Sequence, residues 1–182
     1  HLEQIAMRLE VKEGKNGCVI INDSYNSDLA SLDIALDFMS RRSEDKGKKR
    51  TLILSDMLET GQSSKLLYRQ VAELVHSRGV EKIIGVGDEI RTASSRFELE
   101  KYFFHSTEDL LKSDLLPNLR NEVVLIKGSR SFHFDDISER LELKVHETIL
   151  EIKLNALVDN LNYYRSKLKP ETKMVCMVKA SA

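Results

Sequence analysis

The sequence predicts an α/β protein whose sheet is open, mainly parallel and flanked by helices. Two observations support this prediction. Short apolar runs rich in β-branched residues, such as residues 18–21 and 123–126, have the composition of strands buried on both faces. Between such runs, apolar residues recur at the three- and four-residue spacing of helices. Alternation of strand and helix along a chain is typical of a parallel sheet.

Each element follows from its own stretch of sequence. Residues 8–12 alternate between polar and apolar side chains, which predicts a short strand ahead of the turn signal Asn16-Gly17. The basic stretch 41–50 is expected to be a solvated loop. The further expected strands are residues 18–21, 51–54, 82–86, 102–104 and 123–126, and the expected helices are residues 29–39, 66–75, 107–116 and 131 to about 143.

A second, smaller unit is predicted after residue 145. It contains a strand at residues 148–152, a helical face formed by Leu154, Leu157, Leu161 and Tyr164, and a strand at residues 174–178. A segment of this size is too small to hold a core alone. We therefore expect a domain at residues 1–145 and a truncated strand-helix-strand segment at residues 146–182, with the chain cut from a longer protein.

The overall composition excludes several classes of function. The 28 basic residues are balanced by 29 acidic ones, which argues against a nucleic-acid partner. No apolar run approaches the roughly 20 residues of a membrane-spanning helix. The histidines and cysteines lack metal-ligand spacing, and no phosphate-binding GxxxxGK[ST] loop is present. We therefore expect no metal site of the chain's own, and any ATP triphosphate to be held mainly by another part of the protein.

Three polar loops follow predicted strands, where parallel sheets bind ligands: residues 22–28, 55–61 and 127–131. Asp23 can accept the hydroxyls of a ribose. Alternatively, Asp23, Ser27 or Asp28 caps the following helix, which is the more common use of such residues. The third loop offers two cations, two hydroxyls and a helix N-terminus to a carboxylate or phosphate, or it is only a strand-to-helix turn. For the loop at residues 55–61 the plain loop interpretation is favoured.

These loops resemble motifs of the Mur ligases, whose carboxy-terminal domain has a Rossmann-like fold. The resemblance covers about residues 5–145 and lies in residues 8–10 (RLE), 22–26 (NDSYN), 54–61 (LSDMLETG) and 125–131 (LIKGSRS). It is greatest to the branch that joins D-Ala-D-Ala to UDP-MurNAc-tripeptide. Met7, Ser55 and Asp28 depart from the family's usual glycine, glycine and asparagine, which leaves local backbone details open.

The resemblance implies a cytoplasmic ligase that forms an acyl phosphate with ATP and Mg²⁺, held mostly by a central domain. The domain alone is then expected to be inactive. The roles it implies are a catalytic contact of Arg8 with the transferring phosphate, a ribose contact of Asp23, and nucleotide contacts of Tyr25 and Asn26. It also implies a D-Ala-D-Ala site formed by Asp56, Lys127, Ser129, Arg130 and Ser131.

The end of the chain resembles the start of alanine racemases. Residues 150–157, 160–161 and 177–180 (MVKA) carry this second resemblance. It implies that Lys179 is the lysine that binds pyridoxal phosphate, and that the parent protein is both a ligase and a racemase. Because an unpaired strand without its barrel can join another chain, self-association through this segment is possible.

Two alternatives remain open. One is a Mur-type or folate-type ligase with another amino substrate, although those relatives usually have histidine where Tyr25-Asn26 stand here. The other is a non-catalytic, nucleotide-binding α/β module. A parent protein without a phosphate loop would favour this second alternative.

Overall fold

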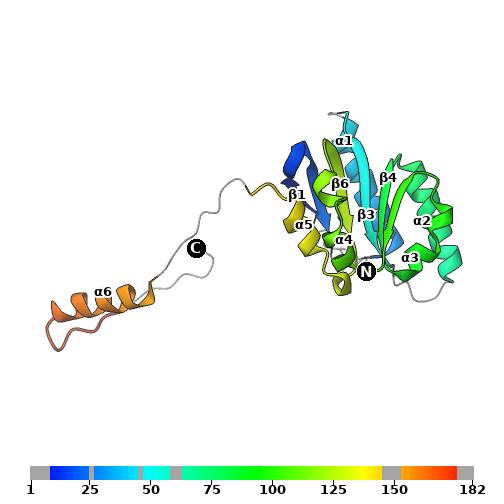
Figure 1. Ribbon diagram of the computed structural model, residues 1–182. Helices are drawn as coiled ribbons and strands as arrows, with labels where there is room; N and C mark the ends of the chain where they lie inside the picture. Colours follow the sequence, from blue (N-terminus) through cyan, green and yellow to red (C-terminus); the bar gives the residue numbers. More distant parts are fainter. Residues whose placement is uncertain (1–8, 25–26, 45–46, 58–62, 145–152, 176–182) are drawn as a thin grey trace. The chain divides into compact units, whose positions relative to one another are not determined.

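The computed structural model describes residues 9–24, 27–44, 47–57, 63–144 and 153–175 (Figure 1). Its contacts divide the chain into two units, His1–Leu143 and Lys144–Ala182. No helix among these described residues is long and apolar enough to cross a membrane.

A six-stranded sheet forms the centre of the first unit. Its order is β1 (Glu10–Glu13), β2 (Val19–Asp23), β6 (Glu122–Lys127), β3 (Lys49–Ser55), β4 (Lys82–Val86) and β5 (Glu100–Phe104). β1 is antiparallel to β2, and the other neighbours are parallel. The predicted mainly parallel α/β sheet is therefore confirmed.

Helices cover both faces of this sheet (Figure 1). The cluster on one face contains buried side chains of α1 (Leu29–Glu44) and α2 (Ser64–Ser77), and the cluster on the other contains those of α4 (Thr107–Lys112) and α5 (Asp135–Leu141). Consecutive strand residues alternate between the clusters. In β3, Leu52 and Leu54 join the first and Ile53 the second.

Three boundaries differ from those predicted from sequence. The expected loop at residues 41–50 is shorter, because α1 extends to Glu44 and β3 begins at Lys49. The helix expected from 107 to 116 ends at Lys112, and Ser106 caps it by accepting from Asp109 N at 3.1 Å. Pro117 lies in a separate 3₁₀ turn, Leu116–Asn118.

The third difference lies beside the predicted D-Ala-D-Ala loop. A helix was expected to start at residue 131, but a 3₁₀ turn occupies Arg130–Phe132 and α5 begins only at Asp135. His133 separates the two with a left-handed backbone at φ 51°. Ser131 therefore does not cap α5. The polar loop is longer than predicted and includes residues 132–134.

Both edge strands of the sheet carry charged side chains. β1 contributes Glu10, Lys12 and Glu13, and β5 contributes Glu100 and Lys101. Lys12 forms an ion pair with Glu142 at 3.4 Å, and Lys49 of β3 forms one with Glu100.

The second unit contains α6 (Leu154–Ser166), which agrees with the helical face predicted there. Several of its apolar side chains are exposed, including Leu154 at 71%. The predicted strand at residues 148–152 lies outside the described residues, as do residues 176–178 of the other predicted strand; residues 174–175 are not in a strand. Self-association stays a prediction.

Candidate functional site

The candidate site lies at the carboxyl end of the parallel sheet, where neighbouring strands lead to opposite faces. The chain leaves β2 toward α1 on one face and leaves β6 toward α5 on the other. β2 and β6 are adjacent and pair Asp23 with Lys127. Divergent loops at such a switch point form the crevice in which open α/β sheets bind ligands.

Asp23 and Lys127 form a buried ion pair at this end. Lys127 Nζ donates to Asp23 Oδ2 at 2.6 Å, with Lys127 0% and Asp23 9% exposed. Buried charges are tolerated only when they are paired. A ribose would have to share the Asp23 carboxylate with this lysine. The ribose role of Asp23 and the substrate role of Lys127 stay predictions.

Asp28 caps α1. Its Oδ1 accepts from Ser31 N at 2.8 Å and its Oδ2 accepts from the Ser31 hydroxyl at 2.7 Å. Burial acts to raise the pKa of Asp28, but these hydrogen bonds outweigh burial and the pKa lies below its usual value. Of the capping alternatives, Asp28 is therefore the residue that caps this helix.

We expect Asp28→Ala to lower the free energy of unfolding by about 1 kcal/mol at neutral pH. Because the folded-state pKa is lowered, the stabilisation by the carboxylate is present above its unfolded pKa and is lost as pH falls through the folded pKa. Urea unfolding at neutral and acidic pH should show this difference shrinking in acid. Asp28→Asn, which keeps a capping oxygen, is the control; if it lost as much stability as Asp28→Ala, capping would not be the cause.

Asp56 is held by a short helix that the sequence did not predict, α3 (Asp88–Thr92). Its carboxylate accepts from Ile90 N at 2.8 Å and Glu89 N at 3.2 Å. The Tyr68 hydroxyl donates to Asp56 Oδ1 at 3.4 Å, and burial raises the pKa of Tyr68, which keeps this donor protonated. These hydrogen bonds hold the Asp56 carboxylate against the start of α3, and its predicted part in the substrate site stays a prediction.

The turn after β6 is attached to β3. Ser129 N donates to Ser55 Oγ at 3.0 Å, and the hydroxyls of Ser129 and Ser131 hydrogen-bond at 2.8 Å. Ser55 stands where the motif that this loop resembles has glycine, and its hydroxyl makes a contact that glycine cannot make.

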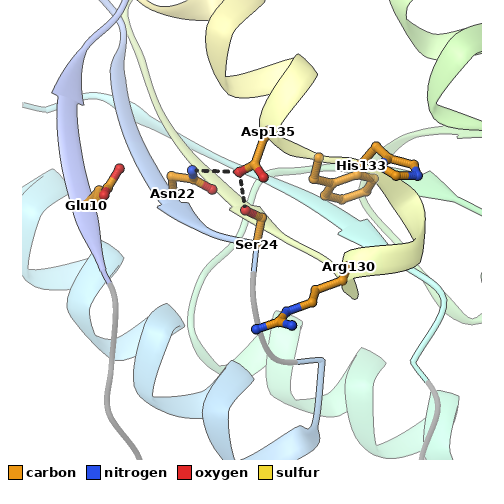
Figure 2. A pocket seen from close by; sticks show the side chains of 7 residues that line it. Glu10, Asn22, Ser24, Arg130, His133 and Asp135 are labelled. Atoms are coloured by element: carbon orange, nitrogen blue, oxygen red, sulfur yellow. Dashed lines mark hydrogen bonds between the residues drawn. The ribbon is translucent and has the colours of Figure 1, made fainter.

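A pocket of about 450 Å³ opens beside this turn (Figure 2). Glu10 of β1, Asn22 and Ser24 at the end of β2, Asp135 of α5, and Arg130 and His133 of the β6 loop line it. Asp135 Oδ1 accepts from the Ser24 hydroxyl at 2.8 Å and from Asn22 Nδ2 at 3.5 Å. The pocket therefore places two carboxylates and one guanidinium group around one space.

A second pocket of about 420 Å³ shares the lining residue His133 with the first. Ser131, His105, Thr107 and Asp136 are among its lining residues. The predicted D-Ala-D-Ala residues are thus divided. Arg130 lines the first pocket, Ser131 lines the second, and neither Asp56 nor Lys127 lines either one.

Four predicted site residues, Arg8, Tyr25, Asn26 and Lys179, lie outside the described residues. In contrast, Ser24, His133 and Asp135 line the first pocket but were not predicted as site residues. The acidic pair Asp135-Asp136 is a helix-start signal that could have located the start of α5 and lengthened the predicted loop.

Comparison with known proteins identifies a family and several relatives of this chain. The model of the family described as "Mur ligase, glutamate ligase domain" matches residues 7–130. The UDP-N-acetylmuramoyl-tripeptide–D-alanyl-D-alanine ligase of Bacillus subtilis is 28% identical over 146 residues, which are 77% of this chain and 31% of that protein. The ligase of the same name from Escherichia coli is 25% identical over 125 residues, which are 68% of this chain and 27% of that protein.

Solved structures show the same fold. A MurF ligase from Thermotoga maritima in complex with ADP superposes with a TM-score of 0.58 at 20% identity, over 76% of this chain and 31% of that one. A MurF from Acinetobacter baumannii superposes with a TM-score of 0.57 at 19% identity, over 72% of this chain and 29% of that one. This chain spans less than a third of these relatives. By the family match over residues 7–130, it belongs to the Mur ligase family and contains the carboxy-terminal domain of those enzymes.

Proposed function

We propose that this chain is part of an ATP-dependent, cytoplasmic ligase that adds D-Ala-D-Ala to UDP-MurNAc-tripeptide in peptidoglycan synthesis. The observation that carries the proposal is Arg130, which extends from the KGSRS turn into a polar pocket at the carboxyl end of the sheet. Six relatives, 25–30% identical, all bear the name of the D-alanyl-D-alanine ligase and support this branch of the family.

The proposed reaction has two steps. ATP phosphorylates the terminal carboxylate of the tripeptide, which gives an acyl phosphate and ADP. The amino group of D-Ala-D-Ala then attacks the acyl carbon, phosphate leaves, and the nitrogen loses a proton to give the new peptide bond. This chain's contribution is to position the acceptor and stabilise developing charge, so the domain alone is not expected to catalyse the reaction.

We assign Arg130, Ser129 and Ser131 to the D-Ala-D-Ala site. Asp56 and Lys127 are assigned to the support of this site. Asp23, Tyr25 and Asn26 are assigned to the nucleotide and Arg8 to the transferring phosphate. Among the described residues, no group of three or more His, Cys, Asp and Glu side chains is arranged to hold a metal ion. On the resemblance to the Mur ligases, Mg²⁺ and the ATP phosphates are assigned mainly to another domain.

The test is phosphate release from ATP by the intact parent enzyme, supplied with UDP-MurNAc-tripeptide in the presence and absence of D-Ala-D-Ala. We expect release that depends on the dipeptide. Release that depends instead on a different amino acid would favour another branch of the family. No release from a folded enzyme with any acceptor would leave a domain that only binds nucleotide.

We also propose that the parent carries an alanine racemase, with pyridoxal phosphate bound through Lys179. The support is the MVKA motif at residues 177–180, and the two activities would be linked because D-alanine is the building block of the dipeptide. Borohydride reduction of the intact parent with pyridoxal phosphate, followed by mass spectrometry, should label Lys179. An unlabelled Lys179 in a protein that racemises no alanine would exclude this part of the proposal.

A further inference from the structure

The pocket beside Arg130 combines opposite charges in a small space. Asp135 and Glu10 supply carboxylates, and Arg130 supplies a guanidinium. Its volume of about 450 Å³ lies in the lower part of the roughly 300–1,000 Å³ range of small-ligand sites. Such a pocket suits a small ligand that itself has a positive and a negative end.

Asp135 is held in place with one oxygen available. Its Oδ1 accepts both hydrogen bonds from the end of β2, from Ser24 at 2.8 Å and Asn22 at 3.5 Å (Figure 2). In the part of the chain that the structure describes, no hydrogen bond or ion pair reaches Asp135 Oδ2. A carboxylate oriented in this way can accept a hydrogen bond from a cationic ligand.

Asn22 supplies a second observation. Its Oδ1 is buried and accepts no hydrogen bond from the described residues, while its Nδ2 is directed to Asp135. A buried acceptor without a donor costs free energy, and Asn22 is one of the residues that line this pocket. Glu10, which lines the same pocket and pairs only loosely with Lys12 at 3.5 Å, adds a further acceptor.

We propose that Asp135 binds the ammonium group of a zwitterionic dipeptide whose carboxylate is bound by Arg130. This inference rests on the proposed function and identifies what selects its acceptor: a free amino end as well as a free carboxyl end. The α-amino pKa of a peptide is about 8, so near neutral pH the dipeptide arrives mainly as the zwitterion. The ammonium group then gives one proton to solvent water, and the neutral amine attacks the acyl phosphate.

The test uses the intact ligase and three ligands. D-Ala-D-Ala has both charged ends, D-alanyl-D-alaninamide keeps only the ammonium, and N-acetyl-D-Ala-D-Ala, used as an inhibitor, keeps only the carboxylate. We expect Asp135→Asn to raise the KM of the first two ligands about tenfold, as expected for loss of one hydrogen bond to a charged group. The inhibition constant of the acetylated ligand and the KM of ATP should not change.

Arg130→Gln should give the complementary pattern. It should raise the KM of D-Ala-D-Ala and the inhibition constant of the acetylated ligand, and it should leave the KM of the amide unchanged. Glu139→Gln is the matched control, because Glu139 is an exposed carboxylate of α5 that lines neither of the two pockets. It should change neither the KM of the two substrates nor the inhibition constant of the acetylated ligand.

Several outcomes would overturn the inference. It is wrong if Asp135→Asn weakens the binding of all three ligands equally or of none of them. It is also wrong if the variant changes only the dependence on Mg²⁺, which would assign Asp135 to a metal. In each case dipeptide-dependent phosphate release by the wild-type enzyme would still uphold the proposed function. If the wild-type enzyme itself showed no such release, the proposed function would fail and this inference with it.

Discussion

Replacing Lys127 by methionine is expected to lower the free energy of unfolding by roughly 3–5 kcal/mol, the cost of breaking a buried ion pair by removing one partner. Methionine keeps most of the length of the side chain, so the packing volume changes little. What is lost is the ammonium group 2.6 Å from Asp23 Oδ2. The Asp23 carboxylate then remains buried without that cation.

Urea unfolding of this chain, followed by circular dichroism at neutral pH, measures the loss. In the double variant Asp23→Asn/Lys127→Met, much of the stability should return, because no uncompensated carboxylate is left. Lys112→Met is the matched control: this lysine is 70% exposed and pairs with Glu108, so its replacement should cost less than about 1 kcal/mol. If the two single variants were equally stable, the buried pair would not stabilise the fold.

Replacing Gly87 by alanine is expected to have an effect of similar size, roughly 3–5 kcal/mol. The backbone at Gly87 has φ 125°, a conformation that costs other residues about 1–3 kcal/mol. An added Cβ would also lie 2.3 Å from the Asp56 carboxylate. Moving that carboxylate would break its hydrogen bonds to Glu89 N and Ile90 N, each of a kind that contributes about 1.5–3 kcal/mol.

The variant Gly17→Ala measures the cost of backbone strain without a steric clash of the added Cβ. Gly17 also has a positive φ, 74°, but an added Cβ there meets no atom within 4 Å. Its replacement should cost only about 1–2 kcal/mol. We expect Gly87→Ala to lose clearly more stability in urea and to speed hydrogen exchange at the amides of Glu89 and Ile90. Equal losses in the two variants would mean that Asp56 adjusts freely and does not anchor α3.

The strands were predictable because their local composition reflects their burial. Residues 123–126 are apolar throughout, and in the sheet their side chains alternate between the two clusters. The order of the strands was not predictable from such local patterns, since β6 lies between β2 and β3 although it comes last in the sheet along the chain. The ion pair between Asp23 and Lys127 was not predictable from local patterns either, since the two residues are 104 positions apart.

The candidate site was predictable only in part. The sequence located polar loops after the strands, because residue type and strand position are both local. It did not reveal that the Asp56 carboxylate is directed to α3, a helix of five residues that is too short to show an apolar repeat. Asp135 was missed because the helix was expected to begin before the left-handed turn at His133.

The charged edge strands have a consequence for how this protein behaves when it is concentrated. An edge strand presents unpaired backbone groups to which a strand from another molecule can add, and charged side chains there oppose such addition. At one edge of this sheet Glu10, Lys12 and Glu13 stand in β1, and at the other Glu100 and Lys101 stand in β5. The folded first unit is therefore expected to resist fibril growth through its sheet.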